Sequence, residues 1–191
     1  LQAIRDGYLV DLKVERVPLN IDLDEIHTVN GDFNQTELDE ALLRANVAQA
    51  VAEAYIEHAA GKKAIVFTVS VDQAKRTAAA LQAEGVAAEW ISGDLPTDER
   101  RAILKRLKTG ETQVVVNCMV LTEGFDEPTV ECVVVARPTK SRSLYIQMIG
   151  RGTRKAPGKD HCLILDVTGV SKRHKLVTAP TLFGLQDVPS G

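Results

Sequence analysis

A strand passes into a helix within ten residues in the stretch Ala64-Ile65-Val66-Phe67-Thr68-Val69-Ser70-Val71-Asp72-Gln73. The apolar run at residues 64–69 is typical of a strand that is buried on both faces, as in a parallel sheet. Ser70, with Gln73 three residues later, forms a capping box and predicts a helix that ends at Gly85. The stretch therefore predicts a buried strand followed directly by a helix.

The same alternation continues on both sides of this stretch. Further strands are predicted at residues 7–19, 87–92, 113–118, 132–136 and 162–167, and helices at 37–60 (one or two), 96–108 and from 141 or 143 to 150. Strands separated by helices need crossover connections, so the predicted fold class is α/β, with a mainly parallel sheet and helices on both faces. Sites on such sheets lie at the carboxyl ends of the strands, here residues 68–70, 92–94, 118–126 and 137–141.

Length and local composition predict how the chain is divided. With 191 residues and 45% hydrophobic side chains it can hold one well-cored domain with an appendage, or two small domains. Residues 20–36 are polar and rich in Asn and Asp, which is typical of a linker. We therefore expect the end of a preceding domain and a linker at 1–36, a compact domain at 37–169, and a tail or the start of a further element at 170–191. Because the first residue is Leu1, we expect a fragment of a longer protein.

Charge and cysteine usage narrow the class of protein. The formal net charge of -3 gives no overall attraction to nucleic acid. Residues 137–159 include no acidic residue and seven basic ones, which are Arg137, Lys140, Arg142, Arg151, Arg154, Lys155 and Lys159. They form either a local basic patch that binds nucleic acid or a solvated face. The three cysteines lie in or beside apolar runs, as expected for buried strand residues in a reducing compartment. We expect no metal site, no signal peptide and no membrane partner, and a location in the cytoplasm or associated with the nucleoid or nucleus.

The segment Gln147-Met148-Ile149-Gly150-Arg151-Gly152-Thr153-Arg154 carries two arginines three residues apart. A helix would place both guanidinium groups on one face. Arginine stays charged and presents a rigid fork of donors, so such a pair can stabilise the charge that develops on a phosphoryl group as it is transferred. A solvated helix face is the alternative explanation of the spacing.

Two further segments have side chains suited to ligands. In Leu121-Thr122-Glu123-Gly124-Phe125-Asp126-Glu127-Pro128, Gly124 permits close backbone approach and Asp126 can accept a hydrogen bond from a sugar hydroxyl; a turn capped by Asp is the alternative. Thr139 and Ser141 stand at a strand end among basic residues, where they can contact a nucleic-acid backbone. They can equally cap the following helix, and both roles are compatible.

These segments, in this order, resemble the second RecA-like domain (P-loop NTPase type) of a superfamily 2 helicase over residues 38–167. The resemblance is carried by residues 121–128 and 147–154, together with Ile65-Val66-Phe67-Thr68, Ser92-Gly93-Asp94 with Arg100, and Arg137-Pro138-Thr139-Lys140-Ser141. The form Leu-Thr-Glu-Gly-Phe-Asp is more similar to DNA-acting DEAH-type members, such as repair and restriction translocases, than to DEAD-box RNA helicases.

The resemblance implies a role for each matching residue. Arg154 would be the arginine finger that reaches the γ-phosphate of ATP, assisted by Arg151, while Gln147 would couple this site to the nucleic-acid groove. The ATP cleft would include Gly124, Gly150 and Asp126, and the strand backbone would be contacted by Thr68, Thr122, Thr139, Lys140 and Ser141. Cys118 departs from the pattern, because many relatives have a threonine there that contacts phosphate.

The sequence lacks the other half of such a site. No G-x-x-x-x-G-K-[ST] loop is present, since Gly61-Lys62-Lys63 lacks both the first glycine and the hydroxyl residue. Asp24-Glu25-Ile26-His27 spells D-E-x-H, but no phosphate loop precedes it, and we interpret it as a chance match. The resemblance therefore implies that ATP and Mg²⁺ are held mainly by a missing N-terminal RecA-like domain of the same protein.

Our hypothesis is that this chain is the C-terminal motor domain of an ATP-dependent DNA helicase or translocase. We expect the fragment alone to be inactive. The expected nucleic-acid partner is DNA, with RNA as the alternative. The alternative is a non-catalytic module that binds nucleic acid or a partner protein through a helicase-like fold. A nucleotide-dependent transferase is a third hypothesis, although no residue cluster supplies a nucleophile or general base.

Overall fold

The computed structural model describes residues 11–118 and 127–170. Six strands form one sheet in the order β1-β8-β7-β4-β6-β5, and every neighbouring pair is parallel. The strands are β1 (Asp11–Asp22), β4 (Ala64–Phe67), β5 (Ala88–Ile91), β6 (Val114–Asn117), β7 (Cys132–Val135) and β8 (His161–Val170). The predicted parallel α/β sheet is confirmed.

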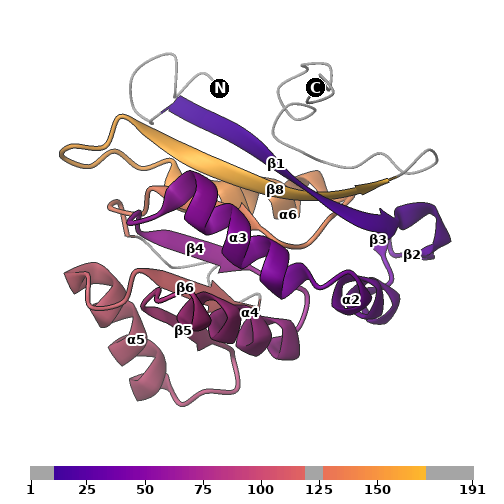
Figure 1. Ribbon diagram of the computed structural model, residues 1–191, viewed down its shortest axis with the longest axis horizontal. Coiled ribbons are helices and arrows are strands. Elements are labelled where there is room, and N and C mark those ends of the chain that lie inside the picture. The colour runs from indigo at the N-terminus through magenta and orange to yellow at the C-terminus, as the bar shows by residue number, and fades with distance from the viewer. Residues whose placement is uncertain (1–10, 119–126, 171–191) are drawn as a thin grey trace.

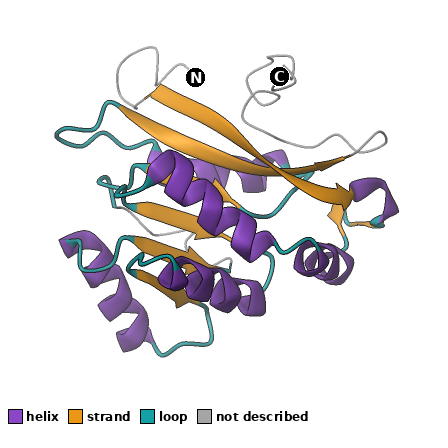
Figure 2. Cartoon of the chain, viewed as in Figure 1, coloured by secondary structure: helices purple, strands orange, loops and turns teal. Residues whose placement is uncertain are grey.

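Helices cover both faces of this sheet. They are α2 (Gln35–Arg44), α3 (Val47–Ala59), α4 (Val71–Ala83), α5 (Thr97–Thr109) and α6 (Arg142–Ile149). Successive residues of each strand point to opposite faces: Val66 joins the core beneath α2, α3 and α4, whereas Ile65 joins the core beneath α5 and α6. Figure 1 shows α3 and α4 in front of the sheet, with α6 behind β1 and β8, and Figure 2 shows the same layers by type.

The start of α4 confirms half of the predicted capping box. Ser70 Oγ accepts a hydrogen bond from the Gln73 amide at 3.1 Å. The Gln73 side chain does not return to Ser70, since its Oε1, the atom that could accept the Ser70 amide, makes no hydrogen bond within the described part of the chain. Gln73 Nε2 donates instead to the Asp39 carbonyl at 3.4 Å, and Ser70 Oγ donates to the Asp39 carboxylate at 2.8 Å. The cap therefore also attaches α4 to α2.

Residues 20–36 differ from the linker that the composition predicts. After β1 come a 3-10 helix (Leu23–Glu25) and a hairpin of β2 (Thr28–Val29) and β3 (Asp32–Phe33). Its turn, Asn30-Gly31, has φ angles of 51° and 83°, the left-handed region that such a tight turn requires. Leu23 and Phe33 are buried at 0% and 4% exposure. This segment thus packs onto the sheet's core; where the domain begins and ends in a longer chain stays a prediction.

In the described part of the chain, no helix combines the length and the apolar character needed to cross a membrane.

Candidate functional site

Helix α6 runs between two groups of predicted site residues, one at the carboxyl ends of the strands and one at their amino ends. It follows the carboxyl end of β7 and leads toward the amino end of β8. Its eight residues correspond to about 12 Å. Ser141 begins it as N-cap, with Oγ accepting from the Leu144 amide at 3.2 Å, so the predicted capping role is confirmed. The loop at 139–141 and the arginine segment therefore lie at opposite ends of one short helix.

The arginine pair is not on a helix face, which corrects the expectation from its spacing. Helix α6 ends at Ile149, and residues Gly150–Gly152 form a 3-10 turn. Arg151 lies in this turn, half-buried, with Nε donating to the Gln147 carbonyl at 3.2 Å, whereas Arg154 lies beyond the turn and is exposed. Gln147, on the last turns of α6, is half-buried.

The α-helical geometry of α6 ends where the backbone at Gly152 packs on β7 and β8. A Cβ atom on Gly152 would lie 2.3 Å from Cys162 Sγ and 2.8 Å from a methyl group of Val133. Only glycine permits this approach without displacing the side chains of Cys162 and Val133. Around Gly150, by contrast, a Cβ would meet nothing within 4 Å.

Lys159 joins the two segments that carry the sequence resemblance. Its ammonium donates to the carbonyl of Pro128 at 3.0 Å and to the carbonyl of Arg154 at 2.7 Å. Burial lowers the pKa of Lys159. The chain that follows Glu127 is thereby tied to the chain that carries Arg154. In the sequence, Lys159 is recognisable only as a member of the basic patch, because a lysine that bridges carbonyls has no local sequence signature.

Thr68 stands at the carboxyl end of β4, and its hydroxyl is hydrogen-bonded within the protein. The residue is 1% exposed, and Oγ1 lies 3.1 Å from the Asn117 carbonyl and 3.0 Å from the Ser70 carbonyl, to which it donates. Asn117 Nδ2 in turn donates to the Val66 carbonyl at 2.9 Å. The two side chains hold β4 and β6 together, and the strand contact expected of Thr68 stays a prediction.

The loop at 139–141 is held by the β2–β3 hairpin. Thr139 is 0% exposed, and its hydroxyl donates to Asp32 Oδ2 at 2.5 Å. The Lys140 amide donates to Asp32 Oδ1 at 2.8 Å. The Lys140 ammonium bonds the Thr28 hydroxyl and lies 5.0 Å from the centre of the Phe33 ring. Thr139, expected to touch a nucleic-acid strand, is thus buried against a carboxylate. The Asn30-Gly31 dipeptide was the available sequence signal for this hairpin.

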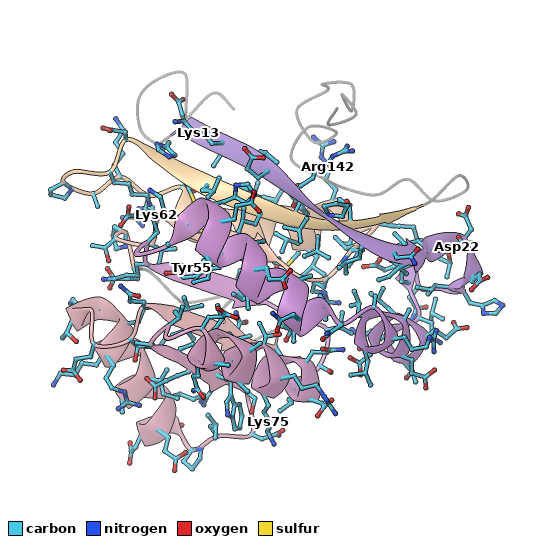
Figure 3. The ribbon with its side chains drawn as sticks, viewed as in Figure 1. Lys13, Asp22, Tyr55, Lys62, Lys75 and Arg142 are labelled. Carbon is cyan, nitrogen blue, oxygen red and sulfur yellow. The ribbon has the colours of Figure 1, made fainter. Side chains whose placement is uncertain are left out.

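Other groups fix α6 on the sheet. The Tyr145 hydroxyl lies 2.7 and 2.8 Å from the two carboxylate oxygens of Asp166, which is buried in the middle of β8. Arg137 is 3% exposed, and burial lowers its pKa while the nearby Asp32 opposes that effect. Arg142, in contrast, is exposed, and its side chain points outward from the start of α6 (Figure 3).

Three predicted site residues, Thr122, Gly124 and Asp126, lie outside the described residues. Within residues 11–118 and 127–170, no group of three or more His, Cys, Asp or Glu side chains could hold a metal ion. The D-E-x-H segment forms the 3-10 helix and the residues after it, with His27 Nδ1 2.7 Å from Glu37 Oε1. The His27 hydrogen bond lowers the pKa of Glu37.

Comparison with known proteins gives one family and a set of relatives. Residues 45–156 match the family model of the helicase conserved C-terminal domain. A protein described as the ATP-dependent helicase IRC3 of Saccharomyces cerevisiae is 33% identical over 97% of this chain, which spans 27% of it. A protein of Schizosaccharomyces pombe described as a mitochondrial ATP-dependent helicase is 34% identical over 97% of this chain, which spans 30% of it. The chain thus spans less than a third of either curated relative.

A solved structure shares the fold. A fragment described as an HsdR subunit of a type I restriction enzyme from Vibrio vulnificus YJ016 superposes with a TM-score of 0.63. It is 22% identical, and the match covers 93% of this chain and 40% of that one. The likeness supports the arrangement of sheet and helices described above.

Proposed function

Because this chain belongs to the family of helicase conserved C-terminal domains, as a RecA-like domain of a superfamily 2 helicase, we propose that it is the C-terminal motor domain of an ATP-dependent DNA helicase or translocase. Its relatives are more than three times its length. In the proposal, an N-terminal RecA-like domain of the same protein supplies the phosphate loop and most of the Mg²⁺ ligands. ATP is hydrolysed between the two domains, and the chain alone is inactive.

The fixed position of the arginine segment carries this proposal. Gly152 packs directly on Cys162 and Val133, and Lys159 ties the carbonyl of Arg154 to the chain beyond Glu127. A donor stabilises developing charge best when it is held in place before the reaction, so that little reorganisation is needed. Arg154 is exposed at the end of this anchored segment, as an arginine must be if it is to reach a phosphate bound by another domain.

The other end of α6 is suited to a nucleic-acid backbone. Ser141 and Lys140 are partly exposed there, next to the exposed Arg142. Hydroxyl and cationic groups at a helix start are common phosphate contacts. In the proposal, closing and opening of the two domains around ATP shifts this surface along the strand. DNA is proposed as the strand because of the form of residues 121–126, with RNA as the tested alternative.

The proposal is tested by measuring ATP hydrolysis by the full-length parent protein with single-stranded DNA, duplex DNA, RNA or no nucleic acid. Arg154→Ala is expected to lower stimulated turnover by about 10³-fold or more, the usual contribution of an arginine finger. The affinity of this variant for the nucleic-acid strand should change by less than about twofold. The only charge lost is one exposed cation, and it lies at the end of α6 opposite the proposed nucleic-acid surface.

Lys155→Ala removes an adjacent exposed charge and should leave turnover near wild type. Unchanged turnover in the Arg154 variant would overturn the arginine assignment. Absence of turnover by the wild type with any of these nucleic acids would favour the non-catalytic module instead.

A further inference from the structure

The carboxylate of Asp32 connects the β2–β3 hairpin to the loop that precedes α6. Oδ2 accepts the Thr139 hydroxyl at 2.5 Å, and Oδ1 accepts the Lys140 amide at 2.8 Å. Oδ1 also accepts the amide of Phe33 at 2.8 Å. Residue 32 lies outside the segment that matches the family model, residues 45–156. The hairpin thus adds a contact to the loop at 139–141 from a segment more than one hundred residues earlier in the sequence.

Two roles are open to a carboxylate in this position. It could occupy the place of a phosphate and block the loop until a strand displaces it, or it could hold the loop in the shape that binds the strand. The first role requires a hairpin that leaves easily, and the second requires one that is anchored.

The hairpin is anchored on both sides of Asp32. Phe33 is 4% exposed and belongs to the core beneath α2 and α3. Asn34 begins α2, with Oδ1 accepting from the Glu37 amide at 3.0 Å and its own amide donating to the His27 carbonyl at 2.8 Å. Figure 1 shows the hairpin beside α2, at the end of β1. Withdrawal of Asp32 would uncover Phe33, which favours the role of support.

The support passes from Asp32 to the start of α6 through hydrogen bonds. Thr139 Oγ1, while donating to Asp32, accepts the amide of Ser141 at 3.0 Å. Ser141 then caps α6 by accepting the amide of Leu144. We propose that Asp32 is a positioning residue for nucleic-acid binding, which holds the loop at 139–141 so that Ser141 and Arg142 lie correctly at the surface. This inference rests on the proposed function, in which that surface contacts the strand.

The sign of the effect distinguishes support from simple electrostatics. A carboxylate near a phosphate backbone repels it, so removal of the Asp32 charge should strengthen binding if charge alone matters. A blocking carboxylate predicts the same direction. A positioning residue predicts the opposite, because a loop that has lost its hydrogen-bond acceptors no longer presents Ser141 and Arg142 in one arrangement.

The experiment compares the full-length parent protein with its Asp32→Ala variant, using fluorescence anisotropy of a labelled single-stranded DNA oligonucleotide. ATP turnover is measured over a range of DNA concentrations in parallel. We expect the Kd for the oligonucleotide, and the DNA concentration for half-maximal turnover, to rise about tenfold. Turnover at saturating DNA should remain within about twofold, because the arginine segment lies at the other end of α6.

Two matched variants make the test specific. Thr139→Val removes the hydroxyl through which Asp32 acts, so the double variant should bind no more weakly than Asp32→Ala alone. Glu25→Ala removes an exposed carboxylate from the same N-terminal segment and should not weaken binding. If Asp32→Ala does not fold, Asp32→Asn keeps the shape and one acceptor, and should raise the Kd by a smaller factor.

The two levels of the proposal fail separately. A wild-type protein that binds neither DNA nor RNA overturns the proposed function and the role of Asp32 with it. A wild-type protein that binds a strand, together with Asp32 variants that bind it equally or more tightly, overturns the positioning role alone.

Discussion

The two glycines on either side of Arg151 have different surroundings. A side chain on Gly150 would enter open space, whereas one on Gly152 would collide with Cys162 and Val133. The resemblance assigned Gly150 to the ATP cleft, an assignment that stays a prediction. The packing constraint falls on Gly152 instead, because there the turn after α6 lies directly on β7 and β8.

Replacement of these glycines by alanine should therefore have unequal effects on stability. Gly152→Ala inserts a methyl group into a closed contact and is expected to lower the free energy of unfolding by about 1–3 kcal/mol. Gly150→Ala should change it by less than about 1 kcal/mol, because it adds no contact at a helix end. Denaturant unfolding of the 191-residue chain measures both. Equal losses would show that Gly152 is not constrained by the sheet.

Some site residues could be predicted from sequence, and the reason differs for each. Ser141 follows a strand and precedes an apolar helix, so its capping role is local and was predicted correctly. The partner of Thr139 is Asp32, more than one hundred positions away in sequence, and no local pattern indicates it. Hydroxyl groups at strand ends were expected to face a ligand, but Thr68 and Thr139 donate to protein acceptors because both are buried.

Among the elements, those with a full apolar run or a clear cap were predicted well. The predicted strand at 64–69 is β4 (Ala64–Phe67), and the predicted helix from Pro96 is α5 (Thr97–Thr109). The hairpin was missed because each of its strands has two residues, too few to show alternation. The end of α6 is set by contact with the sheet, which helix propensity does not describe.

Helix α5 is attached to β5 by a charged cluster near the free edge of the sheet. Arg106 donates to the two oxygens of Glu89 at 2.9 and 2.7 Å, and the Thr112 hydroxyl donates to the same carboxylate at 2.6 Å. The Arg106 hydrogen bond lowers the pKa of Glu89 below its ordinary value of 4.5. The bidentate geometry makes this attachment dependent on the charge of Glu89.

The cluster predicts a pH-dependent contribution to stability. Because the pKa of Glu89 is lowered in the folded state, its stabilising effect is present above pH 4.5 and is lost as the pH falls further. Glu89→Gln should therefore be less stable than wild type at pH 7, and the difference should shrink between about pH 5 and pH 3. Thermal unfolding at several pH values measures this. Glu84→Gln, an exposed change at the end of α4, is the control, and a difference independent of pH would contradict the ion pair.

At the scale of the whole molecule, β1 completes a sheet whose other strands begin only at Ala64. It pairs in parallel with β8, from Asp11 opposite His161 to Pro18 opposite Thr168. Both strands were predicted, but no local pattern indicates that they pair, because such non-local contacts leave no periodicity in the sequence. The apolar side chains of β1 and the hairpin region are buried in the same core as β4 and β7; they are Val17, Leu19, Ile21, Leu23, Ile26 and Phe33.

A chain of residues 37–191 should therefore unfold without a cooperative transition. The six buried apolar side chains contribute roughly 1.5–3 kcal/mol each, which together rivals the net stability of a domain, roughly 5–15 kcal/mol. Calorimetry of this chain and of the 191-residue chain tests the expectation. In the longer chain, Leu19→Asp should destabilise strongly, while Asn20→Asp, on the exposed side of β1, should not. A shortened chain with an unchanged melting temperature would show that β1 is dispensable.

The pairing of β1 with β8 also implies a delay during synthesis, because β1 is made well before the strand with which it pairs. The paired positions are 150 residues apart, Asp11 with His161. At roughly 5–20 residues per second, the ribosome makes β8 about 8 to 30 s after β1. During that interval the apolar side of β1 has no strand to join, so the nascent chain carries an unpaired strand that chaperones would shield. Among the strands of residues 11–118 and 127–170, β8 is made last and joins β1 to the rest of the sheet.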